Sequence, residues 1–298
     1  MTCPRRAFTL IELLIVITVI ALLIGILLPA LGAARRSAFR TREVAALSQV
    51  GTAYAQYAND NADRLLPGYL RGSWARAENR RFIAYEGAND ASEEARIVGS
   101  PLRPYPWRLL PYLNFTYDVL YVDKNLQRDI RERVPNMTER AGFHVSASRN
   151  PSFGLNTTFV GGDAHRGGFT PAAFVRYGAF YVTRMDQPVQ TSRLLIFTTA
   201  RGVLRETNGR KYPGYHRIEA PWHATATSNS VPAFLPWTGS TSHFDPELPT
   251  TAHGHVDFRH LGKAGVLTFD NHVELLSVTA LADMQRWSNK ATSPAWHP

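Results

Sequence analysis

Cysteine is almost absent from this chain. The single cysteine among 298 residues is Cys3, which precedes the long apolar run near the amino terminus. No intrachain disulfide and no cysteine-based metal site can therefore form. A lipoprotein is excluded as well, because its cysteine would have to follow the apolar run.

Acidic residues are also in deficit, with 24 Asp and Glu against 33 Lys and Arg and a formal net charge of +9. This positive charge is compatible with binding to anionic lipid, acidic partners or nucleic acid. Neither basic cluster is accompanied by a DNA- or RNA-binding motif, so no specific nucleic acid is expected. The cluster after the apolar run is better explained by basic side chains at a membrane surface. The two clusters are Arg35, Arg36, Arg40 and Arg42, and Arg76, Arg80 and Arg81.

The apolar run extends from Phe8 to Leu28 and is long enough for a helix to cross a bilayer. Glu12 is its only charge. A carboxylate at the centre of a span costs about 2.5–3.5 kcal/mol on insertion scales, so an intramembrane Glu is a functional hypothesis by default. We therefore expect Glu12 to have an oppositely charged partner.

The segment before this run is basic and ends in a small residue: Arg5-Arg6-Ala7, followed by Phe8-Thr9-Leu10-Ile11-Glu12. The stretch AFTLIELLIVITVIALLIGILLPAL resembles the amino terminus of type IV pilins and type II secretion pseudopilins. The resemblance implies cleavage by prepilin peptidase between Ala7 and Phe8 and methylation of the new amino terminus at Phe8. The family usually has Gly where this chain has Ala7, and Pro29 matches a proline position common in the family.

Glu12 then becomes the fifth residue of the mature chain, matching the family's glutamate. The exposed amine of Phe8 from one subunit is a cation at membrane depth, and it would offset the cost of Glu12 in a neighbouring subunit. The alternative is a signal anchor whose Glu12 reaches the interface. The positive-inside rule favours a cytoplasmic Arg35–Arg42, whereas processing requires the leader to be cytoplasmic and the body outside. We expect the orientation that processing requires, with the leader in the cytoplasm and the body outside.

The sequence divides into a leader (1–7), a transmembrane helix (8–28), an amphipathic continuation of that helix (29–62) and a globular body (63–298). Gly25 and Pro29 predict a kink. Asn59, Asp60 and Asn61 favour helix termination, and a calcium loop is the weaker alternative because further carboxylates are lacking. The apolar stripe of the continuation predicts core packing and consists of Val44, Leu47, Val50, Tyr54 and Tyr57.

The body has strand and core signals but no internal repeat. The stretch Pro104–Asn114 predicts a short helix whose Trp107, Leu110 and Tyr112 pack in the core. Strands are predicted at Ala179–Thr183 and Arg193–Thr199 in an antiparallel sheet. The glycine-rich stretch FVGGDAHRGGF lacks the context of a phosphate loop and is interpreted as an ordinary loop.

A carboxy-terminal segment, residues 253–278, forms the second informative stretch. A hairpin is predicted from Val266–Phe269, a two-residue Asp270-Asn271 turn and His272–Val278. The residues resemble a prepilin-associated signature of His, nine residues, then Asp-Gly, here His260, Asp270 and Asn271. We call these three residues the carboxy-terminal motif. The resemblance implies no biochemical role for it.

Three explanations of this segment remain open. In the structural one, which we prefer, a hydrogen bond between His260 and Asp270 ties the loop to the turn. The other two are a metal site and a catalytic site, although no nucleophile with a nearby base stands out. The metal candidates, besides the motif, are His253, His255, Asp257 and His272.

Together these observations predict an α+β, pilin-like fold with a long amino-terminal helix packed on a mainly antiparallel sheet. The expected function is a non-enzymatic, cofactor-free subunit of a type IV pilus or type II secretion pseudopilus. Its location would be the bacterial inner membrane, single-pass, or a cell-surface filament. Expected partners are prepilin peptidase, other pilin or pseudopilin subunits, the inner-membrane assembly platform and membrane lipid. The alternatives are a membrane-anchored metal-binding protein or hydrolase, and a minor pilin acting as adhesin or DNA receptor.

Overall fold

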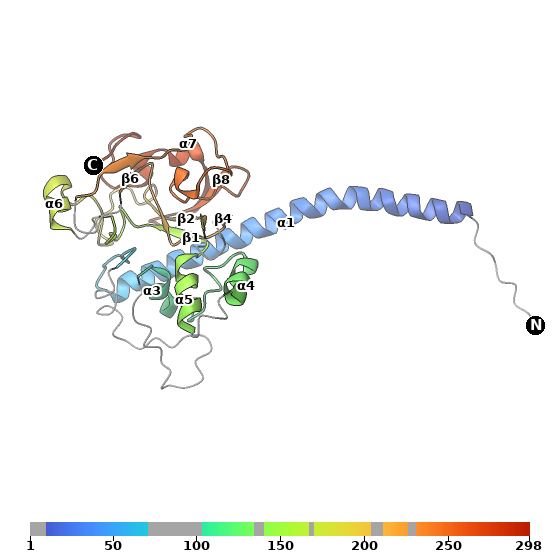
Figure 1. Ribbon diagram of the computed structural model, residues 1–298, viewed down its shortest axis with the longest axis horizontal. Helices are drawn as coiled ribbons and strands as arrows, with labels where there is room; N and C mark the ends of the chain where they lie inside the picture. Colours follow the sequence, from blue (N-terminus) through green and yellow to red (C-terminus); the bar gives the residue numbers. More distant parts are fainter. Residues whose placement is uncertain (1–9, 71–102, 134–139, 167–169, 204–210, 226–230) are drawn as a thin grey trace, which may run out of the picture. The chain divides into compact units, whose positions relative to one another are not determined.

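The computed structural model describes residues 10–70, 103–133, 140–166, 170–203, 211–225 and 231–298 (Figure 1). The chain divides into two units, residues 1–42 and residues 43–298. Helix α1 (Leu10–Asp60) begins in the first unit and ends in the second. It runs without interruption through Pro29, so the proline does not end the helix.

The second unit combines short helices with a five-stranded sheet of order β5-β1-β2-β8-β9. The pairs β1·β2, β2·β8 and β8·β9 are antiparallel, and only the pair β1·β5 is parallel. The fold is therefore α+β with a mainly antiparallel sheet, as the sequence predicts. The strands are β1 (Phe153–Asn156), β2 (Leu195–Thr199), β5 (Arg217–Ile218), β8 (Lys263–Thr268) and β9 (Val273–Ser277).

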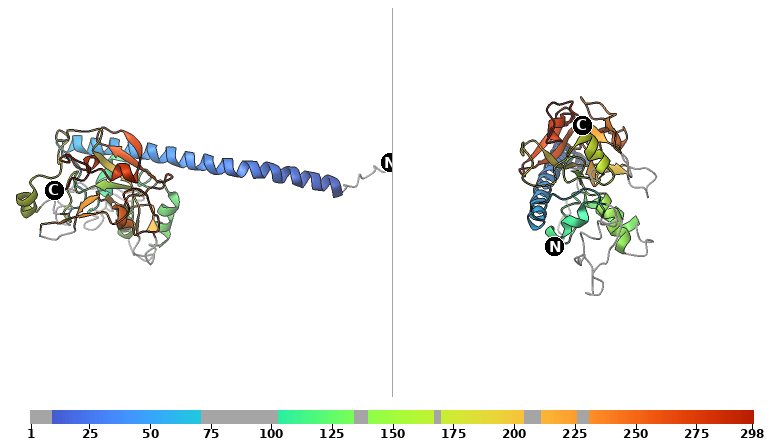
Figure 2. Two further views of the ribbon diagram at one scale, coloured as in Figure 1. Left: turned by 90° about the horizontal axis from the view of Figure 1, so that it is seen from above. Right: turned by 90° about the vertical axis from the view of Figure 1, so that its left-hand side faces the viewer.

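Two further antiparallel pairs lie outside this sheet: β3 (Gly202–Val203) with β4 (Lys211–Tyr212), and β6 (Trp222–Ala224) with β7 (Phe234–Pro236). The short helices are α3 (Pro106–Leu109), η3 (Leu110–Tyr112), α4 (Lys124–Arg133), α5 (Arg140–Arg149), α6 (Pro171–Tyr177), η5 (Thr250–His253), α7 (Val278–Leu281) and η6 (Met284–Arg286). Figure 2 shows the carboxyl terminus on the body, and the ring of His297 lies 4.4 Å from that of Trp222 in β6.

One face of the sheet is covered by residues 43–60 of α1 and by α3. Tyr54 of α1 and Tyr105, which precedes α3, both contact Phe197 of β2, with ring centroids 5.7 and 5.1 Å away. Four residues of the predicted helix stripe, Leu47, Val50, Tyr54 and Tyr57, are buried, and its fifth residue, Val44, is half-buried. The short helix at Trp107 is confirmed as well: Trp107 and Leu110 are fully buried, whereas Tyr112 is half-buried beside Tyr57.

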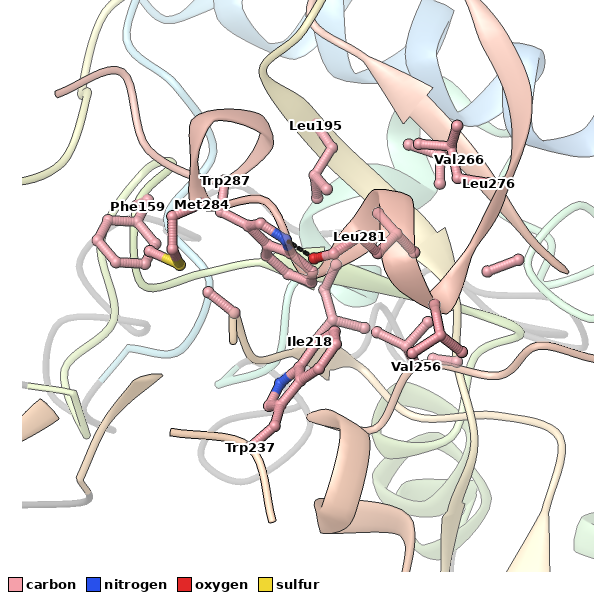
Figure 3. Packing of buried hydrophobic residues seen from close by; sticks show 14 of the residues in the cluster. Phe159, Leu195, Ile218, Trp237, Val256, Val266, Leu276, Leu281, Met284 and Trp287 are labelled. Carbon is pink, nitrogen blue, oxygen red and sulfur yellow. Dashed lines mark hydrogen bonds between the residues drawn. The ribbon is translucent and has the colours of Figure 1, made fainter. Parts of the chain in front are cut away.

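The other face of the sheet carries a second hydrophobic core (Figure 3). It joins alternate residues of β8, Ala264 and Val266, to α7, η6 and the two indoles of Trp237 and Trp287. The indole N–H of Trp287 donates a hydrogen bond to the carbonyl of Leu281 (2.8 Å), so its polar atom is satisfied inside the core.

Two local predictions are wrong. Residues 179–183 do not form a strand; Val182 makes only a single bridge to Val160 in the part of the chain described here. The hairpin loop between β8 and β9 has three residues rather than two, because Thr268 N–H donates to the carbonyl of His272 (2.9 Å). Asn271 alone in that loop has a positive φ of 67°, the arrangement expected when a left-handed residue closes a three-residue loop.

Candidate functional site

The first unit holds an apolar helical surface. The large apolar residues of α1 from Leu10 to Leu31 are exposed. Among the described residues, α1 is the one helix long and apolar enough to cross a membrane. An exposed apolar surface of this length matches the thickness of a bilayer core. Two of the predicted site residues, Ala7 and Phe8, lie outside the described residues.

Glu12 lies in the first turn of α1 and is exposed. A carboxylate at this position complements the positive end of the helix dipole, which is one local reason for a charge at the start of the helix. Further along the apolar part of α1, the hydroxyl of Thr18 donates a hydrogen bond to the carbonyl of Ile15 (2.8 Å). Arg35, Arg36, Arg40 and Arg42 are exposed on the following turns of α1.

In the second unit, His260 of the carboxy-terminal motif contacts Glu43, a residue of α1. The side chain of Glu43 is only 1% exposed. Its carboxylate accepts a hydrogen bond from Nε2 of His260 (2.6 Å), and Nη1 of Arg259 lies 3.5 Å from its other oxygen. Arg259 also contacts Asp257 (Nε to Oδ2, 3.0 Å) and donates to the carbonyl of Ala200 (2.6 Å). A buried carboxylate is thus matched by two nitrogen donors, as burial of a charge requires.

This arrangement corrects the predicted bond between His260 and Asp270. The carboxylate of Asp270 stays local and accepts from the hydroxyl of Thr268 (2.6 Å) and the amide of His272 (3.2 Å). These bonds, with the Thr268 hydroxyl first, lower the pKa of Asp270. His260 and Asp270 lie beyond opposite ends of β8, and a six-residue strand spans about 20 Å, which separates them.

The metal candidates do not converge in the described part of the chain, where no group of three or more His, Cys, Asp or Glu is arranged to hold an ion. His253 Nε2 lies 2.8 Å from the carbonyl of Ser240, and His255 Nδ1 lies 3.3 Å from that of Arg201. Asp257 pairs with Arg259, and His272 is exposed directly after the hairpin loop. Each of these side chains has a separate structural environment.

Sequence reasoning missed a buried ionic cluster formed by Arg166, Arg217 and Glu219. The carboxylate of Glu219 pairs with Nη2 of Arg166 and lies 3.5 Å from Nε of Arg217. Burial alone would raise the pKa of Glu219, but the two arginines outweigh it and the pKa is lowered. Asp163, fully buried in the glycine-rich loop, adds a second carboxylate. No local sequence pattern indicates this cluster, because Arg166 and Glu219 are 53 positions apart.

Comparison with known proteins identifies one segment. The family model of the prokaryotic N-terminal methylation motif matches residues 3–28. No curated protein and no solved structure matches the chain. The matched segment includes Ala7, Phe8, Glu12 and the whole apolar run, and it supports a type IV pilin-like or pseudopilin-like precursor anchored by a single membrane helix.

Proposed function

We propose that this chain is a structural subunit of a type IV pilus or a type II secretion pseudopilus. The observation that carries the proposal is the match of the methylation motif to residues 3–28. The exposed apolar residues of α1, from Leu10 to Leu31, lie almost entirely within this segment. The motif supplies a processing site, and the helix supplies a surface that only lipid or other apolar helices can cover.

In this proposal, prepilin peptidase cuts the peptide bond between Ala7 and Phe8, and the new amino terminus at Phe8 is methylated. The mature chain stays in the inner membrane as a single-pass protein with its body outside the cytoplasm. The assembly platform then adds it to a filament whose subunits contact one another through the apolar part of α1.

Glu12 selects the position of each added subunit. The amine of Phe8 from one subunit and the carboxylate of Glu12 from its neighbour are opposite charges in an apolar medium. A subunit added at another position would leave the carboxylate without a cation at membrane depth. The attraction therefore favours a single register of addition.

Processing is tested by expressing the full-length protein with and without prepilin peptidase, then measuring intact mass and the amino-terminal sequence. We expect a chain that begins at Phe8 only when the peptidase is present. Ala7→Gly should be cleaved faster, since Gly is the residue the family usually carries there. A chain that still begins at Met1 beside an active peptidase, with a known prepilin cleaved in the same cells, would refute processing.

Assembly is tested separately with Glu12→Gln, which keeps the side-chain size and removes the charge. We expect this variant to be cleaved normally and to enter filaments or pseudopili at least tenfold less than wild type. Glu247→Gln, at a side chain of the body that is 91% exposed, is the matched control and should assemble normally. Equal assembly of Glu12→Gln and wild type would contradict the role given to Glu12.

A further inference from the structure

We propose that the carboxy-terminal motif is a register clamp that holds residues 43–51 of α1 against strand β8. The clamp has two points of attachment, one beyond each end of β8. His260 precedes the strand and Asn271 follows it. The motif therefore spans β8 together with the residues that flank it on each side. This inference concerns contacts inside the second unit and does not depend on processing or assembly.

The first attachment is ionic. Glu43 is buried, and its carboxylate is held by His260 at 2.6 Å and by Arg259 at 3.5 Å. The loop that carries these donors is tied to strand β2 through Thr199, whose hydroxyl donates to the carbonyl of Asp257 (2.7 Å) and accepts from the amide of Gly265 (3.1 Å). Sliding α1 along the sheet would leave a buried carboxylate without its donors, which is costly.

The second attachment is steric. A Cβ atom on Gly51 would collide with Oδ1 of Asn271 and approach Cδ2 of Leu267 to 2.9 Å. Glycine at this position lets the Asn271 side chain lie against the helix, whereas a Cβ would force it to turn away. A shift of α1 by about one turn would place Leu47 or Ala55 opposite Asn271, and the Cβ of either residue would displace the Asn271 side chain.

Between the two attachments, helix and strand are complementary in size. Gly265 of β8 leaves space for Leu47, whose Cδ1 would lie 3.1 Å from a Cβ at position 265. Gly51 of α1 leaves space for Leu267 in the same way. The helix positions 43, 47 and 51 share one face because they are four residues apart, and the strand positions 265 and 267 share one face because they are two apart. A small residue on each element thus faces a large one on the other.

The clamp holds Glu43, where the part of α1 that belongs to the second unit begins. Further along α1, Tyr54 packs against Phe197 and Tyr57 packs against Tyr112. Release of the motif would therefore free residues 43–51 while the end of the helix stays packed. Loss of the clamp would therefore affect residues 43–51 alone, whereas a general loss of stability would affect the whole body.

The test is amide hydrogen exchange, read by mass spectrometry, on the full-length protein in detergent micelles. His260→Gln should raise exchange in residues 43–51 at least tenfold and leave residues 54–60 and strand β1 within twofold of wild type. His272→Gln, an exposed histidine directly after the hairpin loop, is the matched control and should change neither region. Glu43→Gln combined with His260→Gln should exchange no faster than the faster single variant, because both changes remove the same contact.

The steric attachment is tested by Gly51→Ala and by its rescue with Asn271→Gly. Gly51→Ala alone should raise exchange in residues 43–51, although Ala is normally the better helix former. Asn271→Gly removes the colliding side chain and tolerates φ of 67°, so the double variant should return to within twofold of wild type. This pair leaves the ionic contact intact and stays informative if His260→Gln fails to fold.

Unchanged exchange of residues 43–51 in both His260→Gln and Gly51→Ala would overturn the clamp. An equal rise across residues 43–60 and strand β1 would overturn it too, because the motif would then contribute only to overall stability. Failure of Asn271→Gly to rescue Gly51→Ala would remove the second attachment.

Discussion

The imidazole of His255 stacks on the phenol ring of Tyr215, with ring centroids 4.1 Å apart and planes inclined by 28°. The tyrosine ring and the surrounding protein keep water away from the imidazole. This burial is the main reason why the pKa of His255 is lowered to about 4. His216 beside it is also buried, and its pKa is lowered well below the ordinary value for the same first reason. The folded protein thus holds two neutral histidines that an unfolded chain would protonate.

This difference predicts that the protein loses stability as pH falls from about 6.5 to about 4. In that range the unfolded chain binds protons at these histidines and the folded protein does not, so the unfolded state is favoured. One pKa unit corresponds to about 1.4 kcal/mol, which gives about 3 kcal/mol for His255 at the lower end of the range. The measurement is denaturant unfolding of the full-length protein in detergent at several pH values.

The control for this prediction is a pair of variants. His255→Gln should flatten the pH dependence by roughly the share of His255, whereas His243→Gln, at an exposed position, should leave it as in wild type. A pH dependence that is equally steep in wild type and His255→Gln would show that other groups cause the acid sensitivity.

Glu219→Gln is expected to destabilise the body by about 3–5 kcal/mol, because it leaves Arg166 and Arg217 buried without their carboxylate partner. The free energy of unfolding at pH 7 is the quantity to measure. Glu247→Gln is the matched control; this side chain is 91% exposed and its contact with Lys211 is long, at 4.0 Å. Losses of similar size in both variants would contradict the role assigned to the buried cluster.

Leu261→Asn is expected to stabilise the protein by about 1 kcal/mol. Leu261 is 92% exposed and has a φ of 52° in the tight turn between His260 and Lys263, where Gly262 follows with φ of 80°. A left-handed conformation costs most L-residues about 1–2 kcal/mol, and Asn tolerates it far better. The thermal midpoint of unfolding is the direct readout.

The comparison for this turn is Val175→Asn, since Val175 is 88% exposed but lies in helix α6. Asn gains nothing from a left-handed preference at that site and should leave the midpoint unchanged or lower it. A midpoint that falls in Leu261→Asn would mean that the leucine makes a stabilising contact that outweighs its backbone strain.

Elements with a local physical cause were predictable from the sequence. The continuous apolar run from Phe8 to Leu28 requires a helix for any segment that enters a bilayer, because only a helix or closed barrel satisfies its own backbone there. Leu47, Val50, Tyr54 and Tyr57 recur every three or four residues, which places them on one face of a helix and predicts that this face is buried. The β8–β9 hairpin follows from alternating apolar residues around Asp270 and Asn271.

Elements whose cause is a distant partner were not predictable. The predicted strand at residues 179–183 had suitable residues, but in the described part of the chain Val182 makes a single bridge to Val160 and no continuous ladder forms. The two-residue turn was one residue too short, because the backbone bond between Thr268 and His272 sets the loop. Local composition does not specify which of two adjacent registers closes a hairpin.

The sequence by itself determined that this protein has a membrane-length apolar helix with one carboxylate, followed by an amphipathic helix and an α+β body, because hydrophobic length and periodicity act within a few residues. Only the tertiary structure decided that His260 contacts Glu43, which is 217 positions away, rather than Asp270. It also decided that Arg166, Arg217 and Glu219 meet in one cluster. A buried charge takes whichever partner the packing of strands and helices brings within reach, and no local pattern records that choice.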